Sequence, residues 1–538
     1  MINVQKIFEH IDRYADVITR DTCIPGMSIA VTDRDKTLGM YTRGFSDLSA
    51  KTPVTSDSLF EIASIGKSFT AIITLQLYDE GKLDLYTPVE KYLPWFYVDS
   101  EYPPITLHHL LGHTAGIIRG TEQAPYGLYD AWALRETKTG FFPGEHWHYS
   151  SIGYKVLGFL LERLTGQTLK ELIQSRILDP LGMTVTYPVI DFETRKHTTV
   201  GYSSLYDDRP ECTDHELVPA LWNEYSTGDG CQVSTAEDMA IFVRMLINRG
   251  TGPDGRLITE ESFYRMAPLA QRTESEQYGY ALVSYPVDGH VFLGHGGGNA
   301  GFSSHILADV DEGIGVVVLT NRRTESEAVY RIAEYILKAL YAVSTGVEVQ
   351  LLPQAYQSIS LDTAVDYTGT YKSDSGVLKI TMDNGRLFLD YEGRAIPLEY
   401  REKDNFYIKH PDFDIFLLEF KRDRETVTEA FYGSRWYTND RYTGPMLFNY
   451  PEEWMAYTGH YRTRNPELSN FRVLLRKGTL VLIYPSGNVE PLIPAGDGLF
   501  KIGNEHRSPE TLRFDAIVEG QAFRAIYSGC PYFRTFTL

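Results

Sequence analysis

The chain has 538 residues, and its 51 Lys and Arg residues face 71 Asp and Glu residues, which gives a formal net charge of -20 at pH 7. This length exceeds what one hydrophobic core organises and predicts two or three domains. The acidic charge without a basic run argues against a nucleic-acid partner, because binding a phosphate backbone needs clustered Lys and Arg. No segment reaches the roughly 20 apolar residues that span a bilayer, so we expect no membrane partner and a cytoplasmic location.

The four cysteines of the chain lie far apart and show no CxxC spacing. This pattern argues against a disulfide framework or a zinc ribbon and favours reduced thiols.

Residues before about 345 alternate strand-like and helical segments. The N-terminal residues Ile7, Ile11 and Tyr14 have helical spacing and lack the basic, then apolar order of a leader peptide. The strongest later predictions are two strands and three helices, at Gly26–Thr32, Ile314–Leu319, Ser64–Glu80, Gly153–Leu164 and Glu325–Tyr341.

The first chemical motif is Ser64-Ile65-Gly66-Lys67, which has S-x-x-K spacing. Apolar residues follow on nearly every face, which predicts a buried helix with Ser64 at its N-terminus and Lys67 one turn on. Burial favours a neutral amine that can take the serine proton. The alternative is a serine that caps the helix and a surface lysine.

The second motif is the loop Gly144–Ser151, which carries Tyr149 just before an apolar helix. A tyrosine beside a Ser–Lys pair can relay protons. The alternative is an aromatic side chain that packs over a loop.

The third motif is Gly294-His295-Gly296-Gly297-Gly298, which precedes a strand-like segment. Glycines let a backbone approach a ligand closely, so an edge strand here could supply an oxyanion-hole N–H while His295 faces the substrate. The alternative is a tight hairpin with an incidental histidine.

The C-terminal part contains a repeat in which Asp366–Tyr371 (DYTGTY) returns as Ala456–Tyr461 (AYTGHY). Further landmarks follow in the same order, and each copy has room for about eight short strands. This part therefore predicts two tandem antiparallel β-barrels after a connector near Val343–Ser358.

Two histidine pairs could suggest zinc, His109 with His113 and His146 with His148. Neither has the carboxylate of H-E-x-x-H, and zinc needs three or four converging ligands. We therefore expect no metal and no cofactor.

Together the three motifs resemble the penicillin-recognising serine hydrolases, in the branch of class C β-lactamases, D-stereospecific aminopeptidases, D,D-peptidases and family VIII carboxylesterases. Four further segments match sequence motifs of this family in the same order and strengthen the resemblance: Pro25–Val31, Leu110–Gly116, Pro180–Met183 and Val233–Met239. The resemblance implies an α/β domain with an antiparallel sheet and a helical lobe in residues 1–352, then barrels in 353–452 and 453–538.

The resemblance also implies roles for residues. Ser64 is the acylated nucleophile, Lys67 the adjacent base and Tyr149 the proton relay. His295 stands where β-lactamases carry the lysine of K-T-G. The backbone N–H groups of Ser64 and Gly298 form the oxyanion hole, with Gly297 and Asn299 as alternative donors.

Two departures bear on the substrate. Ser151 replaces the Asn of Y-x-N, and a histidine replaces the fixed cation of K-T-G. Substrates without a free C-terminal carboxylate are then favoured.

The leading prediction is therefore a D-stereospecific aminopeptidase or amidase on short peptides or amino-acid amides. The alternatives are a carboxylesterase, a β-lactamase or D,D-carboxypeptidase, and a non-catalytic sensor; a homodimer is left open. As in the D-aminopeptidases that the chain resembles, a loop of the last barrel (486–490 or 496–498) could restrict access to the site.

Overall fold

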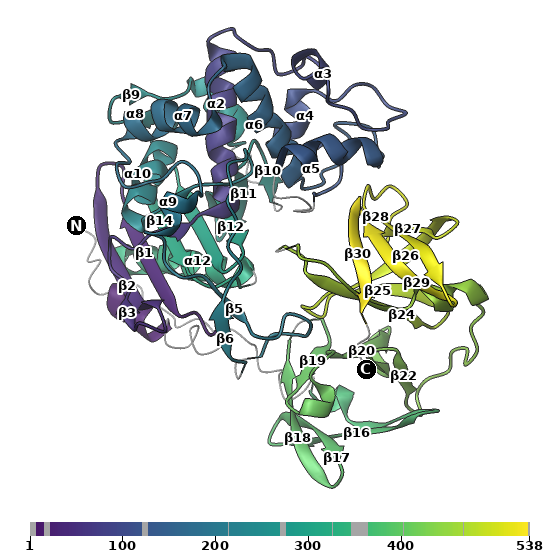
Figure 1. Ribbon diagram of the computed structural model, residues 1–538. Helices are drawn as coiled ribbons and strands as arrows, with labels where there is room; N and C mark the ends of the chain where they lie inside the picture. The colour runs from purple at the N-terminus through teal and green to yellow at the C-terminus, as the bar shows by residue number, and fades with distance from the viewer. Residues whose placement is uncertain are drawn as a thin grey trace. The chain divides into compact units, whose positions relative to one another are not determined.

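The computed structural model describes residues 7–14, 22–120, 127–212, 215–268, 276–324, 326–345, 364–401, 403–465 and 467–535. The chain forms two compact units (Figure 1). The first unit comprises Met1–Ser203 and Leu217–Leu352, and the second comprises Ser204–Glu216 and Pro353–Leu538. The predicted connector lies largely outside the described residues, so the domain boundary at 352 stays a prediction.

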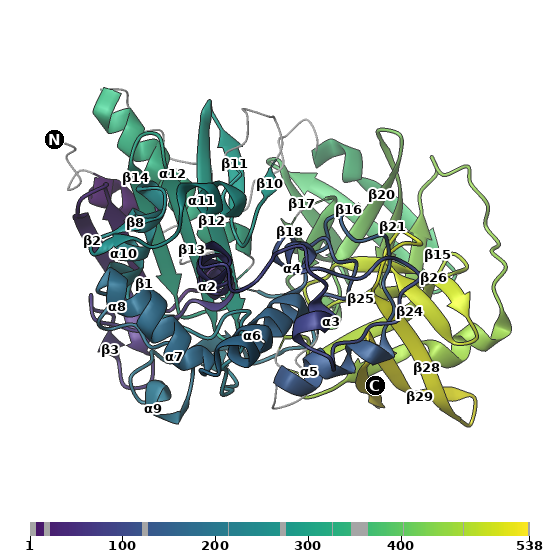
Figure 2. The same cartoon turned by 90° about the horizontal axis from the view of Figure 1, so that it is seen from above.

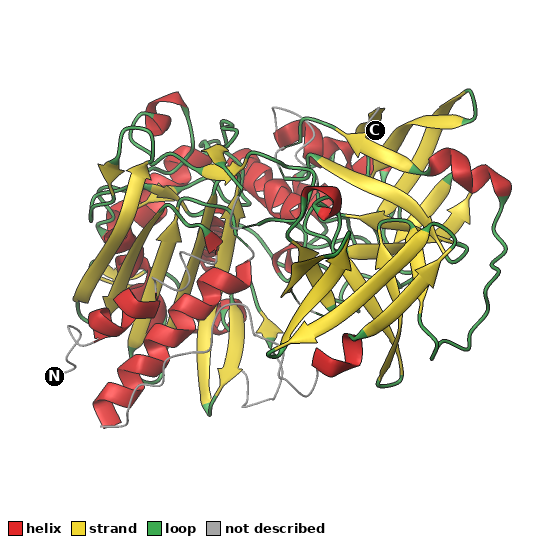
Figure 3. Cartoon of the chain, turned by 90° about the horizontal axis from the view of Figure 1, so that it is seen from below, coloured by secondary structure: helices red, strands yellow, loops and turns green. Residues whose placement is uncertain are grey.

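The centre of the first unit is an eight-stranded sheet with the order β10-β11-β12-β13-β14-β1-β2-β3, in which every neighbouring pair is antiparallel (Figure 3). Its strands are β1 (Gly26–Thr32), β2 (Thr37–Asp47), β3 (Thr52–Pro53), β10 (Gln277–Tyr278), β11 (Val283–Val287), β12 (His290–Asn299), β13 (Phe302–Asp309) and β14 (Ile314–Thr320). Both strands predicted from the sequence, Gly26–Thr32 and Ile314–Leu319, are confirmed.

Helices cover both faces of this sheet. Strands β1, β13 and β14 are buried along their whole length, as expected for strands covered on two sides. Val317 and Leu319 of β14 share a core with Val243 and Ile247 of α10 (Ala236–Ile247). The alternate residues of β14 point the other way, toward α12 (Ser326–Thr345), which lies across the sheet in Figure 3.

The N-terminal helix that the spacing predicts is present at residues 7–14. The ring of Tyr14 packs on Tyr335 of α12 with a centroid distance of 4.3 Å.

The remaining helices of the first unit form the helical lobe and its connections. They are η1 (Ala63–Gly66), α2 (Lys67–Asp79), α3 (Val89–Tyr92), α4 (Leu107–Leu111), α5 (Gly127–Ala133), η2 (Leu134–Glu136), α6 (Ser151–Thr165), α7 (Leu169–Ile173), η3 (Gln174–Leu178), α8 (Asp179–Leu181), α9 (Phe192–Arg195) and α11 (Glu260–Met266). Short strand pairs join them: β4 (Phe60–Glu61) with β7 (Val233–Ser234), β5 (Tyr202–Ser204) with β6 (Leu217–Pro219), and β8 (Thr251–Gly252) with β9 (Gly255–Arg256). None of the helices in the described ranges is long and apolar enough to cross a bilayer.

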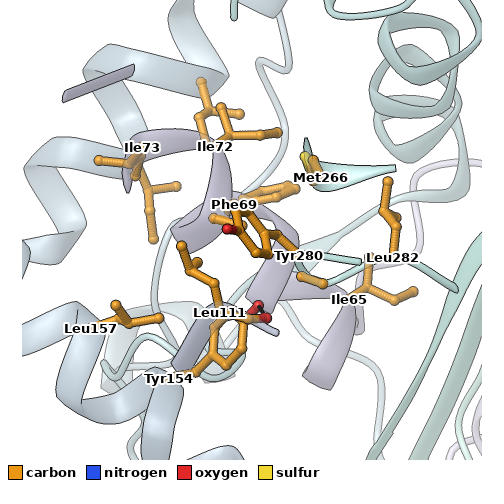
Figure 4. Close-up of a cluster of buried hydrophobic side chains, with 14 of the residues drawn as sticks. Ile65, Phe69, Ile72, Ile73, Leu111, Tyr154, Leu157, Met266, Tyr280 and Leu282 are labelled. Carbon is orange, nitrogen blue, oxygen red and sulfur yellow. Dashed lines mark hydrogen bonds between the residues drawn. The ribbon is translucent and has the colours of Figure 1, made fainter. Parts of the chain in front are cut away.

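Helix α2 is the centre of the lobe. It packs against α6, α7 and α11 (Figures 1 and 2), and it is buried on nearly every face as its composition predicts. Figure 4 shows the cluster around it, in which Ile65, Phe69, Ile72 and Ile73 lie among Leu111, Tyr154, Leu157, Met266, Tyr280 and Leu282. Gly81 follows the helix with a φ of +68°, a conformation in which glycine ends a helix without a steric cost.

The second unit contains two closed eight-stranded antiparallel barrels, as the repeat predicts. The first barrel consists of β15 (Gly369–Ser373), β16 (Gly376–Asp383), β17 (Arg386–Tyr391), β18 (Arg394–Tyr400), β19 (Asn405–Ile408), β20 (Leu418–Asp423), β21 (Thr426–Tyr432) and β22 (Arg435–Thr438). The second consists of β23 (Gly459–Arg462), β24 (Asn470–Arg476), β25 (Thr479–Ile483), β26 (Val489–Gly496), β27 (Leu499–Ile502), β28 (Thr511–Val518), β29 (Gln521–Tyr527) and β30 (Cys530–Thr535).

The repeated sequence occupies the same place in both barrels. A 3-10 turn precedes the first strand of each, η4 (Val365–Tyr367) and η6 (Glu452–Tyr457). The hydroxyl of Tyr371 donates to the Tyr367 carbonyl at 3.0 Å, and that of Tyr461 donates to the Tyr457 carbonyl at 2.8 Å. The repeated tyrosines therefore make the same bond at the same corner of each barrel.

Residues 204–216 leave the first unit and belong to the second, an insertion that no local sequence pattern predicts. Asp208 accepts a hydrogen bond from Arg472 of the second barrel at 3.1 Å. Arg209 pairs with Asp414 of the first barrel at 2.6 Å. This segment therefore contacts both barrels.

Candidate active site

The proposed nucleophile and base are neighbours. Lys67 begins α2, and its Nζ lies 2.9 Å from the Oγ of Ser64, which sits in the preceding 3-10 turn η1. The predicted helix over Ser64–Glu80 thus begins with this tighter turn, in which residues three apart are eclipsed. Lys67 is 0% exposed, so its amine is removed from water and directed at the serine.

A second contact fixes the lysine. Its Nζ donates to the backbone carbonyl of Asp229 at 2.8 Å. The Asp229 carboxylate accepts hydrogen bonds from Tyr225 at 3.0 Å and Thr227 at 2.7 Å. Asp229 therefore holds Lys67 through its main chain and is itself held through its side chain.

The backbone before Ser64 is constrained. Ala63 has a φ of +48°, a left-handed conformation that costs a non-glycine residue about 1 kcal/mol. A Cβ at Gly230, whose φ is +138°, would collide with the Ala63 carbonyl. Glycine at 230 is therefore required for the chain to approach the residue before the nucleophile.

Tyr149 lies over the lysine, on the loop that leads into α6. The Nζ of Lys67 is 5.1 Å from the centre of its ring. Trp147 and Tyr278 pack near the same ring, at centroid distances of 6.3 and 6.4 Å. Tyr149 is thus beside Lys67, and its role as a proton relay stays a prediction.

Ser151 begins α6, two residues after Tyr149. Its backbone N–H donates to the Arg119 carbonyl at 2.8 Å, and its side chain is half-buried. The guanidinium of Arg119 is exposed and lies 5.7 Å from the centre of the Tyr149 ring.

The glycine-rich strand β12 passes directly in front of the nucleophile. A Cβ at Gly297 would collide with the Ile62 carbonyl and with Ser304 Oγ, so glycine is needed for this approach. A Cβ at Gly298 would meet no atom within 4 Å, and Gly298 is exposed. The space beside Gly298 is therefore open to a ligand.

The register of β12 bears on which N–H reaches that space. A two-residue turn joins Asn299 to Phe302, and such turns close on a hydrogen-bonded pair. Pairs then alternate along the ladder, so the N–H groups of Asn299 and Gly297 point to β13 and that of Gly298 points to the opposite edge. Strand β11 pairs with β12 only as far as Gly294, which leaves this edge unpaired near Gly298. Of the three donors considered from the sequence, Gly298 fits best.

His295 lies on the same strand and is 5% exposed. Its Nε2 is 2.9 Å from the hydroxyl of Tyr278, and its Nδ1 is 2.6 Å from the Gly296 carbonyl. Burial and the nearby charge of Lys67 lower the pKa of His295 to about 4, so the ring is neutral at pH 7. Both ring nitrogens are bonded within the protein, and a direct contact of this side chain with substrate stays a prediction.

Sequence reasoning missed three contributors to the site: Tyr278, Asp229 and His113. In the sequence, His113 stands out only as a member of the segment Leu110–Gly116 and of the pair with His109. Its Nε2 lies 3.1 Å from the Tyr278 hydroxyl, and its Nδ1 accepts the Ser150 N–H at 3.0 Å. No local pattern marks Tyr278 or Asp229, because their contacts are with distant parts of the chain.

The surroundings of the histidine pairs bear on the zinc hypothesis. The described part of the chain contains no group of three or more His, Cys, Asp or Glu side chains that could hold a metal ion. His109 instead closes a capping box on Thr106 at the start of α4.

Comparison with known proteins supports the geometry. Residues 8–341 match the family model described as Beta-lactamase. The chain is similar to penicillin-binding protein 4* of Bacillus subtilis (strain 168), with 27% identity over 65% of this chain and 80% of that protein. It is also similar to protein Flp of Staphylococcus aureus (strain N315), with 27% identity over 61% of this chain and 65% of Flp. The structure of an octameric penicillin-binding protein homologue from Pyrococcus abyssi superposes with a TM-score of 0.57 and 26% identity, covering 81% of this chain and 99% of that one.

Proposed function

The chain belongs to the β-lactamase family, and we propose that it is a serine hydrolase that cleaves D-amino-acid amides or short peptides with a free N-terminus through an acyl-enzyme at Ser64. The observation that carries the chemistry is the 2.9 Å hydrogen bond between Lys67 and Ser64 in a buried setting. A lysine at this distance, once it has lost its own proton, accepts the proton of the hydroxyl as its oxygen attacks the substrate carbonyl.

The rest of the reaction uses the neighbouring groups. The N–H groups of Ser64 and Gly298 stabilise the oxyanion of the tetrahedral intermediate. Tyr149 passes a proton from Lys67 to the leaving nitrogen or oxygen, and the C–N or C–O bond breaks to give the acyl-enzyme. Water then attacks the carbonyl of the acyl-enzyme and gives a proton to Lys67. The bond from the acyl carbon to Ser64 Oγ breaks, Lys67 returns the proton to Oγ, and the carboxylic acid leaves.

The substrate class follows from the state of His295. A neutral imidazole with both nitrogens bonded cannot hold a carboxylate as the lysine of K-T-G does. Ser151 also lacks the side-chain amide of Y-x-N. These features favour substrates without a C-terminal carboxylate, and the two C-terminal barrels add the architecture that the chain shares with the D-aminopeptidases it resembles.

Two other candidates each have an observation in their favour. Two carboxylates near the nucleophile are engaged within the protein, since Glu61 accepts from Asn299 at 2.5 Å and Asp229 binds Tyr225 and Thr227. This favours a carboxylesterase, which needs no partner for an ammonium group. The exposed Arg119 beside Tyr149 favours instead a carboxylate-bearing substrate, as in a D,D-carboxypeptidase or β-lactamase.

One screen separates these classes. D- and L-aminoacyl p-nitroanilides, p-nitrophenyl esters and benzylpenicillin are compared at equal enzyme concentration, with Ser64→Ala as the control. We expect hydrolysis of D-aminoacyl p-nitroanilides above the L series and poor turnover of benzylpenicillin. Turnover of esters alone selects the esterase, and efficient β-lactam hydrolysis contradicts the assignment of His295. If a serine-reactive fluorophosphonate labels wild type and Ser64→Ala equally, Ser64 is not the nucleophile.

A further inference from the structure

Three side chains from distant parts of the sequence form one hydrogen-bonded row behind the site. The row runs from His113 through Tyr278 to His295, with distances of 3.1 Å and 2.9 Å. Both histidines are buried, and the tyrosine ring packs on each of them, with centroids 4.8 Å and 5.8 Å away.

The two ends of the row fix the direction of every hydrogen bond in it. A backbone N–H can only donate, so the Ser150 N–H makes the Nδ1 of His113 an acceptor. A neutral His113 then carries its proton on Nε2 and donates to the Tyr278 oxygen. The Tyr278 hydroxyl in turn donates to the Nε2 of His295.

The far end agrees with this direction. A carbonyl can only accept, so the Gly296 oxygen requires a proton on the Nδ1 of His295. That is the tautomer left when Nε2 accepts from Tyr278. For neutral rings the row therefore has a single arrangement of protons.

We propose that Tyr278, oriented by His113, is a positioning residue that holds His295 as its neutral Nδ1–H tautomer. The Nδ1–H of His295 in turn fixes the Gly296 carbonyl within β12, the strand that contains Gly298. The inference rests on the proposed function of Ser64 and Gly298. The Gly296–Gly297 peptide directly precedes the peptide that bears the Gly298 N–H, so its orientation sets the direction of that donor.

The electrostatics of the row support neutral rings. Burial and then the charge of Lys67 lower the pKa of both histidines, that of His113 well below its ordinary value. His148 is a further titratable group that faces His113. Burial raises the pKa of the Tyr278 hydroxyl well above its usual value, so it keeps its proton to donate.

The chain contains a matched control for this row. Tyr280, two residues after Tyr278, also places its hydroxyl on a histidine, 2.6 Å from the Nδ1 of His108. Tyr280 lies in the core around α2 (Figure 4). Tyr278→Phe and Tyr280→Phe thus remove the same atom from the same kind of pair, but only the first touches the row.

The test reads the tautomers directly, in the full-length protein labelled with ¹⁵N-histidine. Long-range ¹H–¹⁵N spectra distinguish a proton on Nδ1 from one on Nε2, and the missing signals of His295→Gln and His113→Gln assign the two rings. We expect His295 as Nδ1–H and His113 as Nε2–H in wild type. In Tyr278→Phe the His295 signals should shift toward a mixture of tautomers, whereas Tyr280→Phe should leave them unchanged.

Kinetics supply a second readout that a general loss of stability would not give. In Tyr278→Phe we expect kcat to fall about 10- to 100-fold with KM within about twofold, as for other lost supporting hydrogen bonds. The acid limb of the pH profile should move to higher pH, because the neutral imidazole loses a donor. Wild-type His295 protonated on Nε2, or a tautomer unaffected by Tyr278→Phe, overturns the proposal. The spectra need no substrate, so they decide it even if the proposed activity is absent.

Discussion

The side-chain nitrogen of Lys67 lies one turn from Ser64 and bonds to two oxygens at once, the Ser64 hydroxyl at 2.9 Å and the Asp229 carbonyl at 2.8 Å. The second bond keeps the lysine at the serine when no substrate is present. The proposed base therefore lies within hydrogen-bond distance of the nucleophile in the absence of substrate.

Lys67→Ala should therefore reduce kcat/KM by about 10³-fold or more, with the fold intact, because the serine loses the proposed base, whose Nζ lies 2.9 Å from its Oγ. The double variant with Ser64→Ala should be no worse than Ser64→Ala alone, since the two residues act as one unit. Turnover of the best p-nitroanilide or ester substrate measures this, with circular dichroism as the check on folding. If the activity loss of the double variant equals the product of the two single-variant losses, the two residues act independently.

Gly230→Ala should reduce turnover at least about tenfold, because its Cβ would displace the Ala63 carbonyl and with it Ser64. The control is Gly81→Ala, which has a positive φ of +68° but open space around the added Cβ. It should cost about 1 kcal/mol of stability and leave turnover within about twofold. Equal kinetic effects of the two variants would show that the contact with Ala63 is unimportant.

His305 predicts how stability depends on pH. It is 3% exposed, neither ring nitrogen has a hydrogen-bond partner among the described residues, and burial lowers its pKa to about 3. The unfolded histidine takes up a proton near pH 6.5 while the folded one stays neutral, so stability is lost as the pH falls from about 6.5 toward 3.

His305→Gln should remove up to about 1.4 kcal/mol per pH unit from that slope between pH 6 and 4. Hydrogen exchange of β13 peptides over a pH series measures the free energy of unfolding. Above pH 7.5 the curves of wild type and variant should run parallel, with any constant offset due to the change in packing. Parallel curves down to pH 4 would contradict the prediction.

The ion pair between Lys155 and Asp130 joins α5 to α6 at 2.8 Å, with side chains only 2% and 1% exposed. Asp130→Asn should lower the free energy of unfolding by about 3 kcal/mol, because it leaves a buried charge without its counter-ion. The exposed pair of Lys196 and Glu193 is the control, and Glu193→Gln should cost less than about 1 kcal/mol. Hydrogen exchange of α6 peptides measures the free energy of unfolding of both variants. Equal losses in Asp130→Asn and Glu193→Gln would contradict the prediction that the buried pair contributes more than the exposed pair.

Asp208 anchors residues 204–216 within the second unit through its ion pair with Arg472. Asp208→Ala should make this segment more sensitive to chymotrypsin at Tyr206, since an exposed backbone is cut when its local contacts are lost. Asp311→Ala, which removes an exposed pair with Arg249, is the control and should not change the digestion pattern. Mass spectrometry of the fragments identifies the cut. A segment cut equally fast in wild type would show that these bonds do not hold it.

Local patterns in the amino-acid sequence were sufficient to predict several features of the fold and the site. The apolar run after Lys67 predicts a buried helix because helix burial follows composition over a few turns. The DYTGTY repeat predicts two equivalent barrels because each copy contains its own strands and turns. The S-x-x-K spacing places Ser64 beside Lys67 because residues three apart share one helical face.

The contacts between distant segments of the chain are apparent only from the folded structure. Asp229 reaches Lys67, and Tyr278 bridges His113 to His295, through the packing of loops and strand edges that no local pattern specifies. Which glycine of the run supplies the proposed oxyanion-hole N–H depends on the register of β12 with β13. A run of identical residues contains no sequence feature that distinguishes one position from the next. The burial of His295 and its two hydrogen bonds have the same cause, because burial and hydrogen-bond partners are properties of the packed chain.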